Sequence, residues 1–456
     1  MNLIFFLLIA IAFVVAAYRQ LTFDPSPLVP ATDAAGATVG TAIPLQVPMD
    51  AMTTAVVEAA ETAVELAIGL IGVMALFIGL MAIVEAAGGL AVIARVMKPL
   101  MVRLFPDIPP DHPAMGAMIM NISANFLGLG NAATPFGLKA MEELDKLNPV
   151  KGTATNAMVL FLAINTAGLT LLPTSVVALR AQAGSTNPAG IVATTIFATA
   201  TSMIVAIAAA KLMQRFFSGG ESVPESVLKG TAAVGELAAR NAATHDTAQN
   251  PMDADVTGYP LWVSVVALLA ILAAIPLTVI YGKVVSPWII PTLIVGMVLI
   301  GMLNKVPVYE VFIEGAKDGF NIAVKIIPYL VAILVSVAMF RASSAMDLLL
   351  VPLGKLTALV GLPIEGLTMA MMRSLSGSGA FGLLASFLKD PAIGPDSYTG
   401  YLVSTMYGST ETTFYVLAVY FGAVQVRRIR HALAVGLVAD AAAVVAAIAV
   451  CTVLYG

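Results

Sequence analysis

The sequence contains little charge for its length. Of its 456 residues, 11% are Asp, Glu, Lys or Arg and 59% are hydrophobic. About a quarter of the residues in a soluble domain are charged, so this composition excludes an ordinary soluble protein. The net charge is −4, and basic residues concentrate only in a short cluster at 427–431. Nucleic-acid binding needs a broad basic face, so we expect no nucleic-acid partner and interpret this cluster as an anchor beside a membrane helix.

Residue types that carry catalysis or bind metals are also scarce. One cysteine, Cys451, excludes an intrachain disulfide, and the three histidines are scattered along the chain. The sequence contains no HExxH or GxSxG motif. The stretch GSGAFG at 377–382 has the spacing of a dinucleotide-binding loop, but no predicted strand precedes it as that fold requires. We therefore expect no enzyme, no metal site and no cofactor, although coupling to H⁺ or Na⁺ stays open.

Long apolar runs are abundant instead. Crossing about 30 Å of hydrocarbon takes roughly 18 or more apolar residues. The predicted spans are 2–18, 66–86, 154–179, 191–214, 260–281, 286–303, 322–341, 397–425 and 432–454. Shorter pieces, broken by Gly, Asn, Ser and Pro, fall at 87–101, 113–146, 345–360 and 364–390, and are candidates for re-entrant hairpins and surface helices. The fold class is therefore an all-α polytopic membrane protein.

Two hydrophilic stretches, 19–62 and 217–258, interrupt this pattern. The second is typical of a flexible linker, and predicts domains at 1–216 and 259–456. No Lys or Arg precedes the first apolar run, so we expect a retained span and not a secretory signal. Placing most basic clusters in the cytoplasm gives a multi-pass protein of the bacterial inner membrane with its N-terminus and linker cytoplasmic. A homo-oligomer stays open.

The two halves share an order of segments. Residues 69–100 parallel 325–356, and HPAMGAMIM at 112–120 parallels LPIEGLTMAM at 362–371. In the orientation above, the spans at 66–86 and 322–341 cross in opposite directions. An inverted repeat of this kind is typical of secondary transporters with a site near the midplane. A chance likeness of apolar segments is the alternative.

Polar side chains cluster in the broken pieces. In the first half they are Asn121, Asn125, Asn131 and Thr134, among glycines and a proline. Amides in lipid are costly unless they meet each other, water or a solute. They either satisfy the backbone of a hairpin tip or line a polar cavity. We favour the cavity, with helix N-termini supplying partial positive charge.

The second half offers a matching set, and two spans are interrupted by polar residues. The hairpin candidate at 364–390 contains Arg373, Ser374, Ser376 and Ser378. The interruptions hold Asn165 and Thr166 in one span, and Ser409, Thr410, Glu411 and Thr412 in the other. Glu411 is an acid at membrane depth, where charge is expensive enough to indicate function. It is either a structural ion pair with Arg373 or a ligand for solute, cation or proton.

The same stretches resemble a known family. NISANFLGLGNAATPFGLKAMEEL and FLAINTAGLTLLPTSVVALR resemble spore maturation protein A, and GSTETTFYVLAVYFGAVQVRRIRHALAVGLVAD resembles spore maturation protein B. Together the resemblances cover nearly the whole chain, as a fusion of both would. This implies two nucleoside-recognition (Gate) domains, each with a re-entrant hairpin, and a relation to concentrative nucleoside transporters. RSLSGSG departs from the Pro-containing form expected near Leu375.

The sequence thus predicts a secondary transporter of a small polar solute, with a nucleoside as one candidate. Its site would lie between the two hairpins and the broken spans. A passive channel and a non-transporting scaffold for envelope or spore maturation are the alternatives. An intramembrane enzyme is the least supported.

Overall fold

The computed structural model describes residues 2–22, 47–128, 130–217, 258–345, 354 and 357–456, and for some residues inside these ranges, including 130–132, only the main chain. Most of the predicted linker and of the piece at 345–360 therefore lies outside the described residues. The described part is helical and contains no β-strand, only an isolated bridge between Thr153 and Arg428. The helices are α1 (Asn2–Leu21), α2 (Pro48–Ala86), α3 (Gly89–Leu104), α4 (Pro113–Phe126), α5 (Gly130–Lys146), α6 (Asn156–Ala167), α7 (Thr174–Gln182), η1 (Pro188–Gly190), α8 (Ile191–Met213), α10 (Leu261–Leu303), α11 (Val308–Ala342), η3 (Ala358–Val360), α13 (Ile364–Leu375), α14 (Gly377–Lys389), α15 (Tyr398–Ser409), α16 (Thr413–Ala423) and α17 (Ala432–Tyr455).

Local signals in the sequence set several helix starts. α4 begins with Pro113, whose missing N–H costs nothing in the first turn, and His112 Nδ1 accepts a hydrogen bond from Ala114 N at 3.1 Å. The hydroxyl groups of Thr155, Ser376 and Ser397 accept from backbone N–H groups in the first turns of α6, α14 and α15. Such caps satisfy donors that a helix start leaves free.

Three helical segments among the described residues are long and apolar enough to cross a membrane: Pro48–Ala86, Pro188–Met213 and Ala432–Tyr455. Two expectations need correction. α10 is one continuous helix where we predicted two spans, because Gly282 and Lys283 do not end it; a helical glycine costs only about 1 kcal/mol. α2 and α11 begin earlier than their predicted spans, so residues 48–62 and 308–321 are also helical.

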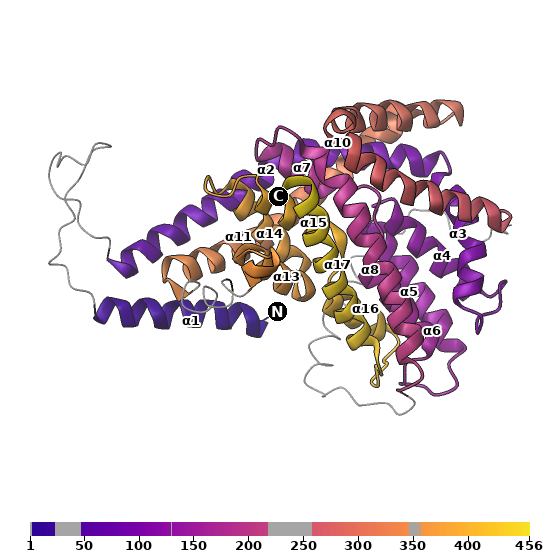
Figure 1. The fold of residues 1–456 in the computed structure, drawn as a ribbon, viewed down its shortest axis with the longest axis horizontal. Helices are drawn as coiled ribbons and strands as arrows, with labels where there is room; N and C mark the ends of the chain where they lie inside the picture. The colour runs from indigo at the N-terminus through magenta and orange to yellow at the C-terminus, as the bar shows by residue number, and fades with distance from the viewer. Residues whose placement is uncertain (1, 23–46, 129, 218–257, 346–353, 355–356) are drawn as a thin grey trace.

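Helices α2 and α11 pack closely and antiparallel. Gly319 lies against Ala75, Gly315 against Gly79 and Ala82, and at the other end Arg341 shares a cleft with Glu58. A Cβ atom on Gly319 would lie 2.6 Å from Ala75 Cα, so the absent side chain permits the close approach that is common between membrane helices. With α1, these helices form the arm on the left of Figure 1.

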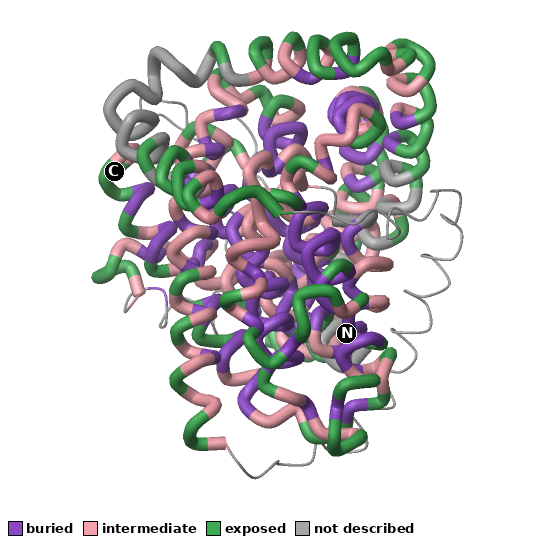
Figure 2. Tube along the Cα trace, turned by 90° about the vertical axis from the view of Figure 1, so that its right-hand side faces the viewer, coloured by how far each residue is buried: buried purple, intermediate pink, exposed green. Residues whose placement is uncertain are grey.

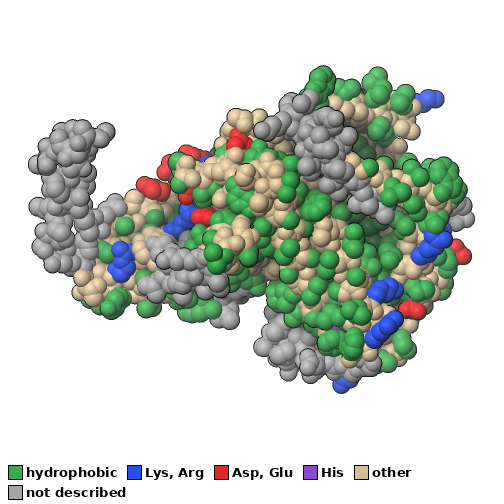
Figure 3. All heavy atoms as spheres, viewed as in Figure 1, with side chains coloured by type: hydrophobic (Ala, Val, Ile, Leu, Met, Phe, Trp, Pro, Cys, Tyr) green, Lys and Arg blue, Asp and Glu red, His purple; other side chains and the backbone are tan. Residues whose placement is uncertain are grey.

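The rest of the chain is a helical bundle with two large hydrophobic clusters. One cluster joins α2, α7, α11, α13, α14 and α15, and the other joins α3, α4, α5, α6 and α16. α8 and α17 pack together and contribute to both, so they form the seam of the bundle (Figure 1). Buried residues concentrate in the middle of the molecule (Figure 2). Hydrophobic side chains also cover much of the face in Figure 3, with charged groups sparse. Exposed Trp262, Trp288 and Phe216 illustrate this surface, which suits contact with lipid.

Candidate functional site

Two interrupted helices meet where the sequence places its polar residues. α6 ends at Ala167 and α7 begins at Thr174; α15 ends at Ser409 and α16 begins at Thr413. The two breaks touch: Glu411 N donates to Thr166 O at 2.8 Å. The predicted interruptions are therefore present, and they lie side by side although 245 residues separate Thr166 from Glu411 in the chain.

Local chemistry explains both breaks. Gly168 caps α6 in the left-handed conformation, with φ of +50°, which glycine adopts at little cost. Thr410 and Thr412 are extended, and β-branched side chains favour extended backbone. The break after α15 leaves terminal carbonyl groups of one helix and terminal N–H groups of the next facing the same region.

The short helix pair α4–α5 supplies an amide cluster on one side. Asn125 Nδ2 donates to Asn165 Oδ1 at 3.1 Å, and Asn121 Nδ2 donates to Ala133 O at 2.8 Å. Tyr420 on α16 joins them, since its hydroxyl accepts from Asn121 at 3.2 Å and donates to Asn165 Oδ1 at 3.4 Å. The cluster thus links α4, α6 and α16, and Tyr420 is a member that the sequence gave no reason to select.

The second short pair, α13–α14, supplies a buried cation. Arg373 Nη2 lies 3.5 Å from Glu411 Oε2 and donates to Thr410 O, while Nη1 donates to Thr412 Oγ1 at 3.3 Å. The guanidinium also lies over the Tyr407 ring, 4.5 Å from its centre. Arg373 therefore fastens α13 to the second break. The predicted Arg373–Glu411 ion pair is present, but the Glu411 side chain is 45% exposed.

Asp440 on α17 is a second acid at this place, and our sequence analysis did not select it. Its Oδ2 accepts hydrogen bonds from Ser374 Oγ at 2.6 Å and from Thr413 Oγ1 at 2.7 Å. A lone acid within an apolar span was the signal that could have found it. Ser374, a predicted site residue, thus contacts Asp440 instead of facing an open cavity.

The remaining predicted residues differ in their hydrogen bonds and in their exposure. Ser376 caps α14 through Gly379 N, and Ser409 donates to Met406 O within α15. Ser378 is exposed, and Thr166 is buried. Thr134 is partly buried on α5. The side chain of Asn131 lies outside the described residues.

Among the residues that the structure describes, four polar atoms on α4, α13 and α17 are buried and have no hydrogen-bond partner. They are Asn121 Oδ1, Ser123 Oγ, Arg373 Nε and Asp440 Oδ1. Buried polar atoms are normally satisfied by protein, water or ligand. The set contains acceptor oxygens and one donor nitrogen, Arg373 Nε. In the described part of the chain, no three His, Cys, Asp or Glu side chains gather to hold a metal ion.

A cleft of about 480 Å³ lies elsewhere, between α2, α11 and α14. Glu58, Arg341, Lys389 and Asp390 line it beside apolar residues, and Arg341 pairs with Asp390 at 3.2 Å. It includes none of the predicted site residues. Arg341 thereby bridges α11 to the residue after α14.

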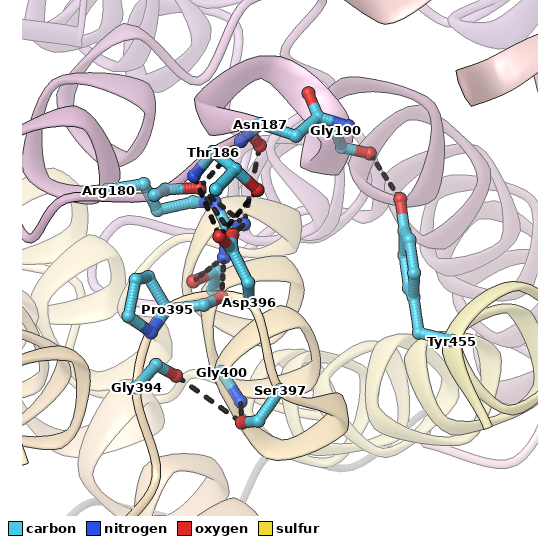
Figure 4. A network of polar contacts seen from close by, with 12 residues as sticks. Arg180, Thr186, Asn187, Gly190, Gly394, Pro395, Asp396, Ser397, Gly400 and Tyr455 are labelled. Carbon is cyan, nitrogen blue, oxygen red and sulfur yellow. Dashed lines mark hydrogen bonds and ion pairs between the residues drawn. The ribbon is translucent and has the colours of Figure 1, made fainter. Parts of the chain in front are cut away.

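A separate polar network joins the two halves of the chain (Figure 4). Arg180 on α7 is fully buried, pairs with Asp396 at 3.2 Å and lies over the Tyr401 ring. Asp396 also accepts hydrogen bonds from Ser185 Oγ at 2.5 Å and Thr186 N at 2.7 Å. Burial alone would raise the pKa of Asp396, but these hydrogen bonds and the Arg180 charge outweigh it and lower the pKa below its ordinary value.

Fold and site together define the class: a polytopic α-helical membrane protein whose polar residues gather where helices are interrupted. The Gate family model, described as nucleoside recognition, matches residues 67–214. Spore maturation protein B of Bacillus subtilis is 46% identical over 167 residues, which are 37% of this chain and 93% of that protein. Spore maturation protein A of the same organism is 47% identical over 163 residues, 36% of this chain and 81% of that protein. No solved structure matches.

The chain belongs to the family of spore maturation proteins A and B, with a nucleoside-recognition (Gate) region. Two relatives, each matching about a third of the chain, agree with a fusion of both. The predicted family is therefore confirmed. None of the names that these matches carry describes an enzyme, and the absence of enzymatic activity stays a prediction.

Proposed function

We propose that this chain is a secondary transporter of a small polar solute, nucleoside-like in its hydrogen-bonding groups, in the bacterial inner membrane. The observation that carries the proposal is the meeting of two helix breaks, near buried polar atoms that have no partner among the described residues. Broken helices at a polar centre are the usual solute site of secondary transporters. The nucleoside-recognition description of the matching family supports the solute class.

In this proposal the two short helix pairs hold opposite sides of the solute. Asn121, Asn125 and Asn165 present amide donors and acceptors, which suit the edges of a base. Arg373 and Glu411 present a charged pair whose acid is half exposed and so within reach of a solute. Thr134, Thr166, Thr410 and Thr412 border the site, and Asn131 stays a proposed member.

Alternating access would come from movement of one helix pair against the rest, as in re-entrant hairpins of inverted repeats. The antiparallel course of α2 and α11, which contain the corresponding spans of the two halves, supports the inverted relation. The proposal also includes a cytoplasmic N-terminus and domain limits at 1–216 and 259–456. It further includes a homo-oligomer and coupling to H⁺ or Na⁺.

A passive channel and a membrane scaffold for envelope or spore maturation are the competing functions. A scaffold for spore maturation agrees with the names of both relatives. It does not explain the buried polar atoms that have no hydrogen-bond partner among the described residues. A channel would pass solute without saturation. A scaffold would tolerate loss of the polar cluster while still supporting assembly.

Counterflow in proteoliposomes separates these functions. Vesicles containing the full chain are loaded with unlabelled uridine and adenosine, and entry of the labelled nucleosides is followed. Transport predicts saturable accumulation that Asn125→Ala and Glu411→Gln reduce at least tenfold. Glu314→Gln, an exposed acid on α11, is the matched control and should behave as the parent. Unsaturable entry would indicate a channel, and full gradient-dependent uptake by Glu411→Gln would remove the role of that residue.

A further inference from the structure

Asp440 occupies an unusual position on the seam helix of the bundle. It is the ninth residue of the 24-residue α17 and the only Asp, Glu, Lys or Arg in that helix. It lies about 12 Å along the helix axis from the first residue, and 9% of it is exposed. An acid at this depth is expensive and therefore a candidate for function.

The two oxygen atoms of Asp440 have different surroundings. Oδ2 accepts from Ser374 on α13 and from Thr413, the first residue of α16. Oδ1 is buried and has no hydrogen-bond partner in the described part of the chain. An ionised carboxylate with a bare, buried oxygen is unfavourable, whereas a proton on Oδ1 removes the charge and leaves both hydroxyl hydrogen bonds on Oδ2.

From this geometry we propose that Asp440 is a proton-binding site that links its protonation to the placement of α13 against the second helix break. An O–H bond forms at Oδ1 with a proton from water, and breaks by returning the proton to water. Ser374 and Thr413 hold the carboxyl group toward α13 and α16 at once. A change in the charge of Asp440 therefore keeps both hydrogen bonds but changes their strength.

Arg373 is the cation next to Ser374 in the chain, and it is engaged by Glu411 and the second helix break. The guanidinium pairs with Glu411 at 3.5 Å and donates to Thr410 O and Thr412 Oγ1. Glu411 is thus paired with a cation and 45% exposed, while the hydrogen-bond partners of Asp440 among the described residues are hydroxyl groups. Solute that drew Arg373 away from Glu411 or toward Asp440 would change the proton affinity of Asp440.

Other titratable groups around α17 are few. α6, α15 and α16 pack on α17 and contain no Asp, Glu, Lys, Arg or His. α13 carries Glu365 in its first turn besides Arg373, and α8 carries Lys211, which donates to Leu104 O at the far end of that helix. Tyr407 lies under Arg373, and Tyr420 contacts the asparagines. Tyr398 and Tyr401 contact α17 near its C-terminal end, at Thr452 and Tyr455.

Infrared spectroscopy of the purified full chain tests the site without a known solute. As the pH is lowered, the parent should gain absorption from a protonated carboxyl group that Asp440→Asn lacks. Glu314→Gln should keep it. Ser374→Ala removes one hydrogen bond to Oδ2 and should move the pH of this transition by about one unit, or roughly tenfold in proton affinity. That second variant keeps the test decisive if Asp440→Asn does not fold.

An unchanged band in Asp440→Asn would overturn the proposal. So would stabilisation by Na⁺ over choline that the parent shows and Asp440→Asn loses, because it would make the site one for a metal cation. The coupling of this proton to solute rests on the proposed function, and the two fail separately. If the carboxyl band depends on Asp440 but no counterflow occurs, only the transport function is rejected. If counterflow occurs but Asp440→Asn keeps the band, only the proton site at Asp440 is rejected.

Discussion

The backbone N–H of Glu411 donates a hydrogen bond to the carbonyl oxygen of Thr166 at 2.8 Å. Each atom comes from an interrupted stretch: α6 ends one residue after Thr166, and Glu411 lies between α15 and α16. The last carbonyl groups of a helix have no partner within it. The two breaks therefore satisfy one another across the halves of the chain, which holds the polar cluster together in the bundle interior.

Replacement of Gly168 by alanine should disturb this contact. The residue has a φ of +50°, and a Cβ atom would lie 3.1 Å from Glu411 Cγ and 3.3 Å from Glu411 N. The left-handed conformation costs a non-glycine residue about 1–2 kcal/mol, so we expect a loss of about that size in the free energy of unfolding in detergent. Gly116→Ala is the control, because nothing lies within 4 Å of its Cβ position and alanine favours a helix. Equal stability of the two variants would contradict this packing.

Removal of the Tyr420 hydroxyl should weaken the amide cluster. Tyr420→Phe leaves Asn121 Nδ2 and Asn165 Oδ1 with one hydrogen bond fewer, and such buried losses cost about 1–3 kcal/mol. Chemical denaturation in detergent measures the loss. Tyr309→Phe, at an exposed position of α11, should change the free energy of unfolding by less than about 0.5 kcal/mol. A Tyr420→Phe variant as stable as its control would show that the hydroxyl is dispensable.

The Arg180–Asp396 network should make stability depend on acid pH. The pKa of Asp396 is lowered in the folded state, so its contribution is present above the unfolded value near pH 4 and is lost as the pH falls through the folded value. Asp396→Asn should therefore reduce the free energy of unfolding by about 2 kcal/mol at neutral pH, and the difference from the parent should shrink below about pH 4. Asp107→Asn, in the exposed loop before α4, should leave the pH profile unchanged. A difference that is constant with pH would exclude the ionised carboxylate as the cause.

The helix breaks were predictable from the sequence because their residues have strong local preferences. Gly168 ends α6 and the threonines around Glu411 favour extended backbone, so both interruptions fell where the polar residues indicated. Pro113 and Ser376 likewise marked the starts of α4 and α14. The composition alone was enough for a helical membrane protein.

The partners across the bundle were not predictable, because they depend on tertiary packing. Nothing in the apolar stretch around Tyr420 indicates that its hydroxyl reaches Asn121 and Asn165. Nor does the sequence around Arg180 indicate that its buried side chain connects the two halves through Tyr401 and Asp396. The continuous α10 also escaped prediction, since Gly282 weakens a helix without ending it.

Ligand-induced stabilisation of the purified chain tests the central claim most directly. The full-length protein in detergent is screened against nucleosides, nucleobases, amino acids, small peptides and dicarboxylates. A solute that binds the folded state at about 100 times its Kd should add about 2.7 kcal/mol to the free energy of unfolding. The account predicts saturable stabilisation by a nucleoside that Asn125→Ala and Glu411→Gln lose and Glu314→Gln keeps. Stabilisation by no compound, or the same stabilisation in all variants, would contradict a solute site at the crossing of the two helix breaks.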